Sequence, residues 1–389
     1  MCFQWKMFRL VLLLALSWHS VYAVANDASP NESFPGEVSL FLPDVLHAVP
    51  GIEANVYFDN LVLLLNPANY VFDVTCNKGM QQAERWTYIP KEGEEGSYAI
   101  TVEVRNIRNE IIARASSVLT VHTAAPLVKD THSMLIIGDS LTHAGVYTQH
   151  LLDLGNQDLY PGISLIGSHG KDANVHEGYG GWTAKLFATH YTGMAREGLY
   201  KDRGSPFLYE DGEGKRTLDF NRYCDDVNGG KLPEVITIFL GCNDTFSATD
   251  ETIKARIEEM LTHLDQLIAM IHQVAPTIRI GLIPAVPAAA SQDAFGRNYR
   301  NGQTRWQYKR NQHAVVQTMY ARYRGKEAEG ISLIPAFVNL DCAYNYPAVE
   351  VAVNSRNEAS VTRQNNGVHP NANGYRQIGD SVFCWLLSQ

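Results

Sequence analysis

In the C-terminal two-thirds of the chain, short apolar runs alternate with longer segments in which apolar residues recur every three or four positions. The apolar runs are predicted buried strands at 134–137, 163–166, 235–240, 278–283 and 331–334. The periodic segments are predicted helices at 144–154, 250–274, 306–323 and 372–387. Strands that alternate with helices are typical of a parallel sheet covered by helices. We therefore predict an α/β domain over 133–389.

The chain between residues 36 and 122 follows a different pattern. Short runs rich in β-branched and aromatic residues are separated by turn signals such as 66–67 and 92–96, and no helical period interrupts them. Segment 97–104 alternates most clearly between apolar and polar positions. Regularly spaced short strands predict a small all-β sandwich, which a linker at 123–132 joins to the α/β domain.

Four aromatic residues of this predicted sandwich allow two interpretations. Tyr57, Phe58, Trp86 and Tyr88 either form a sugar-binding face or pack in the core, and the usual burial of large aromatic side chains favours the core. We find no catalytic constellation in 36–122 and predict that this region is an accessory domain.

The N-terminus has the pattern of a signal peptide. Lys6 and Arg9 precede the apolar run 10–16, and the small residues Ala23 and Ala25 follow it. The run is shorter than the roughly 20 residues that a membrane-spanning helix needs. We therefore predict a signal peptide at 1–25, export to the periplasm or the extracellular space, and no stable insertion in a membrane. An uncleaved anchor is the alternative.

Composition, net charge and cysteine spacing limit the classes of function that this chain can have. Hydrophobic residues make up 45% of the chain and charged residues 19%, which is typical of a globular protein. The formal net charge of -9 and the lack of a basic stripe argue against a nucleic-acid binder. Five cysteines follow the signal peptide, at spacings unlike those of zinc sites. They form either one or two disulfides or buried thiols, and apolar surroundings favour thiols for Cys242 and Cys384.

One apolar run leads directly to a candidate nucleophile. The predicted strand 134–137 stops at Gly138 and places Asp139 and Ser140 in a turn before a helix. Backbone N–H groups at the start of a helix favour developing negative charge, which a reaction through an oxyanion requires. The alternative is an ordinary helix start in which serine is the N-terminal signal.

Three further stretches follow other predicted elements. A glycine-rich stretch, 178–183, comes after the second strand, and 241–244 comes after the third, where Asn243 can aim its amide N–H at an oxyanion. Near the C-terminus, 365–371 contains His369, a candidate general base. Each stretch alone is more often an ordinary turn or loop, but the four together and in this order are specific.

Together these stretches resemble the four motif blocks of the SGNH (GDSL) hydrolase family. The matching residues are Gly138-Asp139-Ser140-Leu141, Gly178 to Thr183, Gly241-Cys242-Asn243-Asp244 and Gly367-Val368-His369-Pro370. The resemblance covers 133–389 and not the predicted sandwich. It implies a three-layer α/β/α fold and a serine ester hydrolase that works through an acyl-enzyme, with no metal and no organic cofactor.

The resemblance also implies the role of each residue. Ser140 is expected to be the nucleophile and His369 the general base. The expected oxyanion hole consists of the Ser140 backbone N–H, a backbone N–H from the glycine block and the side chain of Asn243. We prefer Gly181 as the glycine-block donor.

The spacing within the glycine block leaves its donor open, so Gly178 and Gly180 are alternatives to Gly181. Asp139 and Asp244 are expected to hold the geometry of their loops by local hydrogen bonds rather than to act on substrate.

One position departs from the family pattern. The family's acid lies three residues before the catalytic histidine, and here that position is Asn366. An asparagine carbonyl can accept the imidazole N–H and orient the ring, but it cannot supply negative charge. Either a Ser-His pair works with help from Asn366 or a backbone carbonyl, or another carboxylate such as Asp341 stands in, or activity is low or lost.

The predicted export and the accessory sandwich point to a large substrate outside the cytoplasm. Our first hypothesis is a carbohydrate O-acetylesterase that acts on an acylated small molecule or polysaccharide. Tyr179, Trp182 and Trp306 either stack on sugar rings or pack the domain. The alternatives are a lipase, lysophospholipase or thioesterase of the GDSL type, and a degenerate protein that binds glycan without cleaving it.

Overall fold

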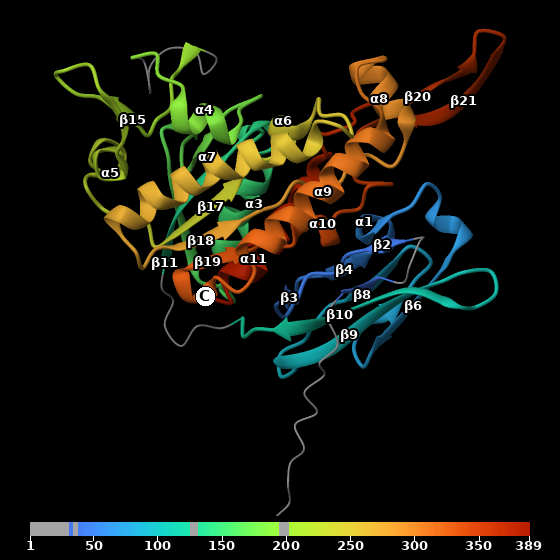
Figure 1. Cartoon of the computed structure of the whole chain (residues 1–389). Helices are drawn as coiled ribbons and strands as arrows, with labels where there is room; N and C mark the ends of the chain where they lie inside the picture. The colour runs from blue at the N-terminus through green and yellow to red at the C-terminus, as the bar shows by residue number, and fades with distance from the viewer. Residues whose placement is uncertain (1–30, 34–37, 125–130, 194–201) are drawn as a thin grey trace, which may run out of the picture.

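The computed structural model describes residues 31–33, 38–124, 131–193 and 202–389, which Figure 1 draws as ribbons. The predicted signal peptide, 1–25, and residues 125–130 of the predicted linker lie outside the described residues. The limits of the predicted domains therefore stay a prediction.

The C-terminal part of the chain is built on a sheet whose strands run parallel, apart from one hairpin. The strand order is β13 (His169–Lys171), β14 (Asn174–Gly178), β11 (Thr131–Gly138), β17 (Val235–Phe239), β18 (Arg279–Leu282) and β19 (Ile331–Leu333). Only β13 and β14 pair antiparallel in this order. β12 (Gly162–Ile166) pairs parallel with the first half of β11.

Helices cover both faces of this sheet. Along β11, Met134 and Ile136 join one apolar core, whereas Leu135 and Ile137 join a second, because successive strand residues point to opposite faces. The first core contains α3 (Val146–Gly155) and α11 (Ala372–Leu386). The second contains α4 (Ala184–Thr189), α5 (Phe220–Asn228) and α7 (Ile253–Val274). α9 (Arg305–Tyr323) contributes residues to both cores. The predicted three-layer fold is therefore confirmed.

The N-terminal region is made of strands, as predicted. Its largest sheet holds β1 (Asn31–Ser33), β10 (Ile111–Val121), β9 (Gly96–Arg105) and β6 (Val71–Cys76), with β3 (Val45–Ala48) beside β10. Smaller sheets pair β4 (Ala54–Tyr57), β8 (Arg85–Tyr88) and β7 (Met80–Gln81), and β2 (Ser39–Leu40) with β5 (Val62–Leu63). A short helix, α1 (Phe58–Leu61), and the 3-10 turn 67–69 were not predicted.

The four aromatic residues of this region are core residues. Tyr57, Phe58, Trp86 and Tyr88 are each at most 9% exposed, so they do not form an open sugar-binding face. The β region and the α3–α11 side of the sheet share one continuous apolar core. In Figure 1 the N-terminal strands lie against the side of the α/β part that carries α10 (Ala336–Asn339) and α9.

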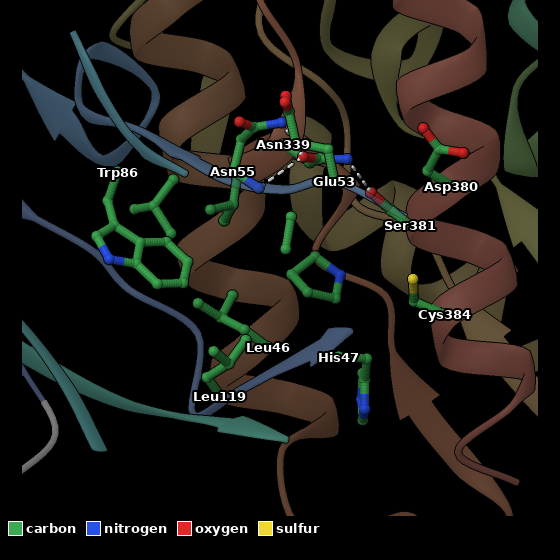
Figure 2. Close-up of a pocket in the computed structure, with 14 residues that line it drawn as sticks. Leu46, His47, Glu53, Asn55, Trp86, Leu119, Asn339, Asp380, Ser381 and Cys384 are labelled. Atoms are coloured by element: carbon green, nitrogen blue, oxygen red, sulfur yellow. Dashed lines mark hydrogen bonds between the residues drawn. The ribbon is translucent and has the colours of Figure 1, made fainter. Parts of the chain in front are cut away.

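Buried polar contacts fix the two parts together. Asn339 Oδ1 accepts hydrogen bonds from the backbone N–H and the side-chain Nδ2 of Asn55, at 2.9 and 3.0 Å. Asn339 Nδ2 donates to the carbonyl of Gln377 and to Ser381 Oγ. Figure 2 shows these side chains beside a cavity of about 30 Å³ between the β region and α11. The contact is closely packed at this place, because the cavity has room for about one water molecule.

The remaining elements lie mostly around the edges of the sheet. They are α2 (Ser140–His143), β15 (Leu208–Glu210), β16 (Arg216–Leu218), α6 (Cys242–Thr245), α8 (Gln292–Tyr299), the 3-10 turn η3 (Glu327–Glu329), β20 (Ala348–Asn354) and β21 (Asn357–Gln364). The pattern analysis missed α8 and the β20–β21 hairpin, and Figure 1 shows that this hairpin projects from the molecule near α8. All five described cysteines are thiols.

Candidate active site

The register of the central sheet brings three of the motif blocks to one edge. Gly138, the last residue of β11, lies opposite Gly178 at the end of β14 and opposite Phe239 at the end of β17. The nucleophile block therefore lies between the glycine block and the 241–244 block. This is the carboxyl edge of a parallel sheet, where open α/β folds place their ligands.

Ser140 is the first residue of α2, directly after the turn that ends β11. Asp139 caps this helix, because its Oδ1 accepts the backbone N–H of Leu141 at 2.9 Å. Gly138 has no alternative in this turn, since a Cβ there would lie 2.0 Å from Thr142 Oγ1. Gly138 and Asp139 thus shape the turn that positions the Ser140 side chain.

The fourth block meets the nucleophile across the chain. Ser140 Oγ and His369 Nε2 lie 2.9 Å apart, although the two residues are 229 positions apart in sequence. Both side chains are partly buried. Burial lowers the pKa of His369 below its ordinary value of 6.5, so the imidazole is neutral near neutral pH and able to accept the serine proton.

Asn366 does not support the imidazole as the sequence led us to expect. Its Oδ1 accepts the backbone N–H groups of Val368 and His369, at 3.2 and 3.0 Å. It therefore shapes the loop that carries His369, because an asparagine side chain readily bonds to the backbone two or three residues ahead. Within the described residues, Ser140 is the only hydrogen-bond partner of the His369 ring.

Asp341 does not stand in for the missing acid either. Its Oδ1 accepts the backbone N–H groups of Ala343 and Tyr344, both at 2.9 Å. Its Oδ2 accepts the hydroxyl of Tyr57, in the β region, at 3.3 Å. Among the residues that the structure describes, the site is thus a Ser-His pair without a carboxylate hydrogen-bonded to the histidine.

Two backbone donors beside the nucleophile are unoccupied. The N–H groups of Ser140 and Gly181 have no acceptor among the described residues. Gly181 is the third residue of a β-turn closed by the Trp182 N–H to Tyr179 carbonyl bond of 3.1 Å. Its φ of 80° is that of a type II turn, a conformation that glycine adopts without strain. Free N–H groups in this setting suit an oxyanion.

The third expected donor, Asn243, is held by two acceptors. Its Nδ2 donates to Asp139 Oδ2 at 3.2 Å and to the Trp182 carbonyl at 3.0 Å. These bonds anchor the side chain between the nucleophile block and the glycine block. An oxyanion bound by Asn243 would share one Nδ2 hydrogen with Asp139, because the hydrogen bond to Asp139 is the longer of the two.

Two buried carboxyl groups hold the loops of the site. Asp139 is 1% exposed, and burial together with the nearby charge of Asp244 raises its pKa to about 7. Asp244 Oδ1 accepts the backbone N–H of Ala184 at the start of α4, and burial raises the pKa of Asp244 to about 6. Asp139 thus bonds to the backbone of its own block and to the side chain of Asn243, and Asp244 bonds to the backbone directly after the glycine block.

The glycine block rests on a buried carboxyl that the sequence analysis did not single out. Glu177 is fully buried and accepts hydrogen bonds from the hydroxyls of Tyr179 and Tyr223 and from the backbone N–H and hydroxyl of Ser168. Tyr179 and Trp182 are buried at the same place, and their tilted rings lie with centroids 4.7 Å apart. They pack the domain and do not form a sugar platform. The one signal in the sequence for this supporting role is that Glu177 directly precedes the glycine block.

The comparison with known families settles the class of protein. The model of the GDSL-like Lipase/Acylhydrolase family matches residues 136–377, which include all four motif blocks. The chain belongs to this family of SGNH (GDSL) acylhydrolases, and the resemblance inferred from the motifs is confirmed. A search of curated proteins finds no match.

Several solved structures are similar to the chain at low identity. A family 3 carbohydrate esterase of Clostridium thermocellum has 16% identity and a TM-score of 0.39, with 67% of this chain and 98% of that chain covered. A family 3 carbohydrate esterase of Talaromyces cellulolyticus has 13% identity and a TM-score of 0.35, with 66% and 97% covered. A carbohydrate acetylesterase of Sinorhizobium meliloti has 14% identity and a TM-score of 0.35, with 66% and 99% covered. At these values the likeness says nothing about substrate.

Two further properties concern the described residues alone. None of their helices is both long enough and apolar enough to cross a membrane. No three of their histidine, cysteine or acidic side chains are grouped as a metal ion would require.

Proposed function

We propose that this chain is an exported serine esterase that removes O-acetyl groups from carbohydrate. The observation that carries the proposal is the 2.9 Å contact between Ser140 Oγ and His369 Nε2. Its location beside two unoccupied backbone N–H groups, at the carboxyl edge of the sheet, gives the pair a place to hold an oxyanion.

The reaction would proceed in two steps. Ser140 Oγ attacks the ester carbonyl carbon while His369 Nε2 takes the hydroxyl proton. The tetrahedral oxyanion accepts hydrogen bonds from the N–H groups of Ser140 and Gly181 and from Asn243 Nδ2. Collapse of this intermediate breaks the ester C–O bond, and His369 returns the proton to the leaving alcohol. Water, activated by His369, then attacks the acyl-enzyme and releases acetate.

The missing acid affects how fast this pair can work. In a triad the carboxylate orients the histidine and stabilises the imidazolium that forms. In this chain the His369 backbone is fixed by Asn366, and the ring by Ser140. The pair is therefore positioned, but its positive charge is compensated less than in a triad, which lowers the expected turnover.

A cavity near the catalytic histidine supports the proposed substrate class. It lies next to the His369 loop and is lined by polar and charged side chains of α8, of the segment that follows α8 and of β21, together with Val349 and Val351 of β20. A lipase needs a long apolar groove for its acyl chain, whereas hydroxyl-rich sugars need hydrogen-bond donors and acceptors. The polar lining favours a carbohydrate ester.

The test is acetate release from a panel of acetylated oligosaccharides and polysaccharides, with Ser140→Ala as the control. We expect release from at least one glycan by the wild-type protein and none by the variant. A parallel series of aryl esters from acetyl to decanoyl should show a preference for acetyl. Activity that rises with acyl length would replace the proposal with a lipase or thioesterase.

A second candidate function is a glycan-binding protein that has lost catalysis. It is favoured by one observation, that no carboxylate is hydrogen-bonded to His369 among the described residues. A fluorophosphonate reagent followed by mass measurement separates the two functions. A covalent adduct on Ser140 supports the esterase, and an intact protein without adduct under conditions that label a known serine esterase supports the binding protein.

A further inference from the structure

A groove lies between α8 and the β20–β21 hairpin, directly beside the catalytic histidine loop. Its volume is about 620 Å³. Arg297, Arg300 and Asn301 line it from the α8 side, Val349 and Val351 from the hairpin, and Asn365 from the chain that leads to His369. In Figure 1 both walls stand at one end of the molecule, and the hairpin projects beyond the helices.

Both walls of the groove are tied to the catalytic loop. β21 ends at Gln364, and the backbone N–H of Gly367 donates to Asn298 Oδ1 of α8 at 3.1 Å. The Arg363 guanidinium at the end of β21 pairs with Asp293 of α8 at 2.9 Å. A ligand in the groove would therefore contact Asn365, in the segment that leads to His369.

Half of the polar side chains that line the groove are available to a ligand. The side chains of Arg297, Arg300, Asn301 and Asn365 have no hydrogen-bond or ion-pair partner within the described part of the chain. Three arginines line the groove against one aspartate, although the chain as a whole carries a formal charge of -9. The groove is thus locally basic on an acidic protein, which indicates an anionic ligand.

We propose that this groove binds the carboxylate-bearing sugar residues of an acidic, O-acetylated polysaccharide while the acetyl ester lies at Ser140. Guanidinium groups bind carboxylates through paired N–H donors, and asparagine amides bind sugar hydroxyls. The side chains of Val349 and Val351, which are 41% and 37% exposed, face the apolar C–H side of a sugar ring. The inference rests on the proposed function, because it names the substrate class of the same site.

The kinetic test compares two acetylated polysaccharides and one small ester. Wild-type protein and the double variant Arg297→Ala/Arg300→Ala are assayed on acetylated polygalacturonan, on acetylated glucomannan, which is neutral, and on an aryl acetate. Since the variant loses charge-assisted hydrogen bonds to the acidic polysaccharide alone, the ratio of kcat/KM on the acidic to that on the neutral polysaccharide should fall at least about tenfold. Rising salt should lower the same ratio in the wild type.

A matched control removes the same charge elsewhere. Arg216→Ala/Arg222→Ala removes two arginines from β16 and α5, which Figure 1 shows at the opposite end of the molecule from α8. This variant should keep the wild-type ratio. An equal ratio in the Arg297→Ala/Arg300→Ala variant and the wild type would overturn the proposal, as would a wild type that prefers the neutral polysaccharide.

A binding measurement separates failure of this inference from failure of the proposed function. Calorimetry with de-acetylated polygalacturonate uses the Ser140→Ala protein, with and without Arg297→Ala/Arg300→Ala, so it needs no catalysis. We expect the arginine substitutions to weaken binding at least about tenfold. Such a loss supports the groove even where no ester is cleaved. Equal binding by both proteins rejects the groove even where acetate release proves the esterase.

Discussion

The carboxyl edge of the sheet that carries Ser140, here called the catalytic edge, differs from the contact between the β region and the α/β part in how its polar groups are hydrogen-bonded. Each joins residues far apart in the sequence, Ser140 with His369 and Asn55 with Asn339. In the contact region Asn339 uses both ends of its amide, and Asn60 Nδ2 donates to two carbonyls, of Phe337 and Leu340. At the catalytic edge the N–H groups of Ser140 and Gly181 have no partner in the described part of the chain.

This difference indicates which region has hydrogen-bond donors available for a ligand. Buried polar groups without a partner cost free energy, so the contact region satisfies them and adds stability and rigidity. The catalytic edge leaves its donors free toward solvent, where the cost is small and a ligand can use them. Substitutions at the edge should therefore change rate with little effect on folding, and substitutions in the contact should do the reverse.

The largest expected effect is at the nucleophile. Ser140→Ala removes the attacking oxygen and should lower kcat on an aryl acetate by at least about 10³-fold with no loss of stability. Ser164→Ala, at an exposed position of β12, is the control and should match the wild type. Residual hydrolysis by Ser140→Ala near the wild-type rate would show that another group attacks the ester.

A smaller effect is expected at the third oxyanion donor. Asn243→Ala should lower kcat about 10²- to 10³-fold with little change in KM, because the lost hydrogen bond forms in the transition state. The same change removes the bond to buried Asp139, so urea unfolding should be measured beside the kinetics. A kcat within threefold of the wild type would remove Asn243 from the oxyanion hole.

In the contact region the effect should fall on stability. Asn339→Ala leaves the buried N–H groups of Asn55 without an acceptor and should lower the free energy of unfolding by about 2 kcal/mol. The folded variant should keep its kcat. Asn156→Ala, at an exposed position after α3, is the control and should leave stability unchanged. A variant of Asn339 that loses activity without losing stability would break the comparison between the two regions.

The smallest effect concerns the pH dependence of catalysis. Since burial lowers the pKa of His369 and the neutral imidazole is the active form, the acid limb of kcat/KM should lie below pH 6.5. Asn366→Asp can keep the two backbone bonds and adds a negative charge, which favours the imidazolium, so the limb should move to higher pH.

For the same variant we expect kcat on an aryl acetate to change less than about tenfold, because the loop that carries His369 is already held in the wild type. Asn365→Asp, one position earlier, tests whether a charge anywhere in this loop has the same effect. A wild type no faster than Ser140→Ala would show that the pair without an acid does not work.

The sequence determined the elements and the chemical groups. The unbroken apolar run 134–137 predicted β11, and the periodic segment 250–274 predicted α7. Both predictions were possible because the buried positions of a strand or a helix recur at the spacing of that element and need apolar side chains. The alternating segment 97–104 predicted β9, which extends one residue further at each end. The four motif blocks pointed to Ser140, His369, Gly181 and Asn243, because their chemistry needs those residue types at the ends of strands.

Tertiary structure decided what each group touches. Both Asn366 and Asp341 looked able to support the histidine, and only the folded loops show that each bonds to backbone N–H groups instead. The β20–β21 hairpin and α8 were missed because their side chains are largely exposed, so burial leaves little pattern to read. A local sequence specifies which groups are present and which element carries them. The partners of Ser140 and Asn55, in contrast, lie 229 and 284 positions away in the sequence, which no local pattern encodes.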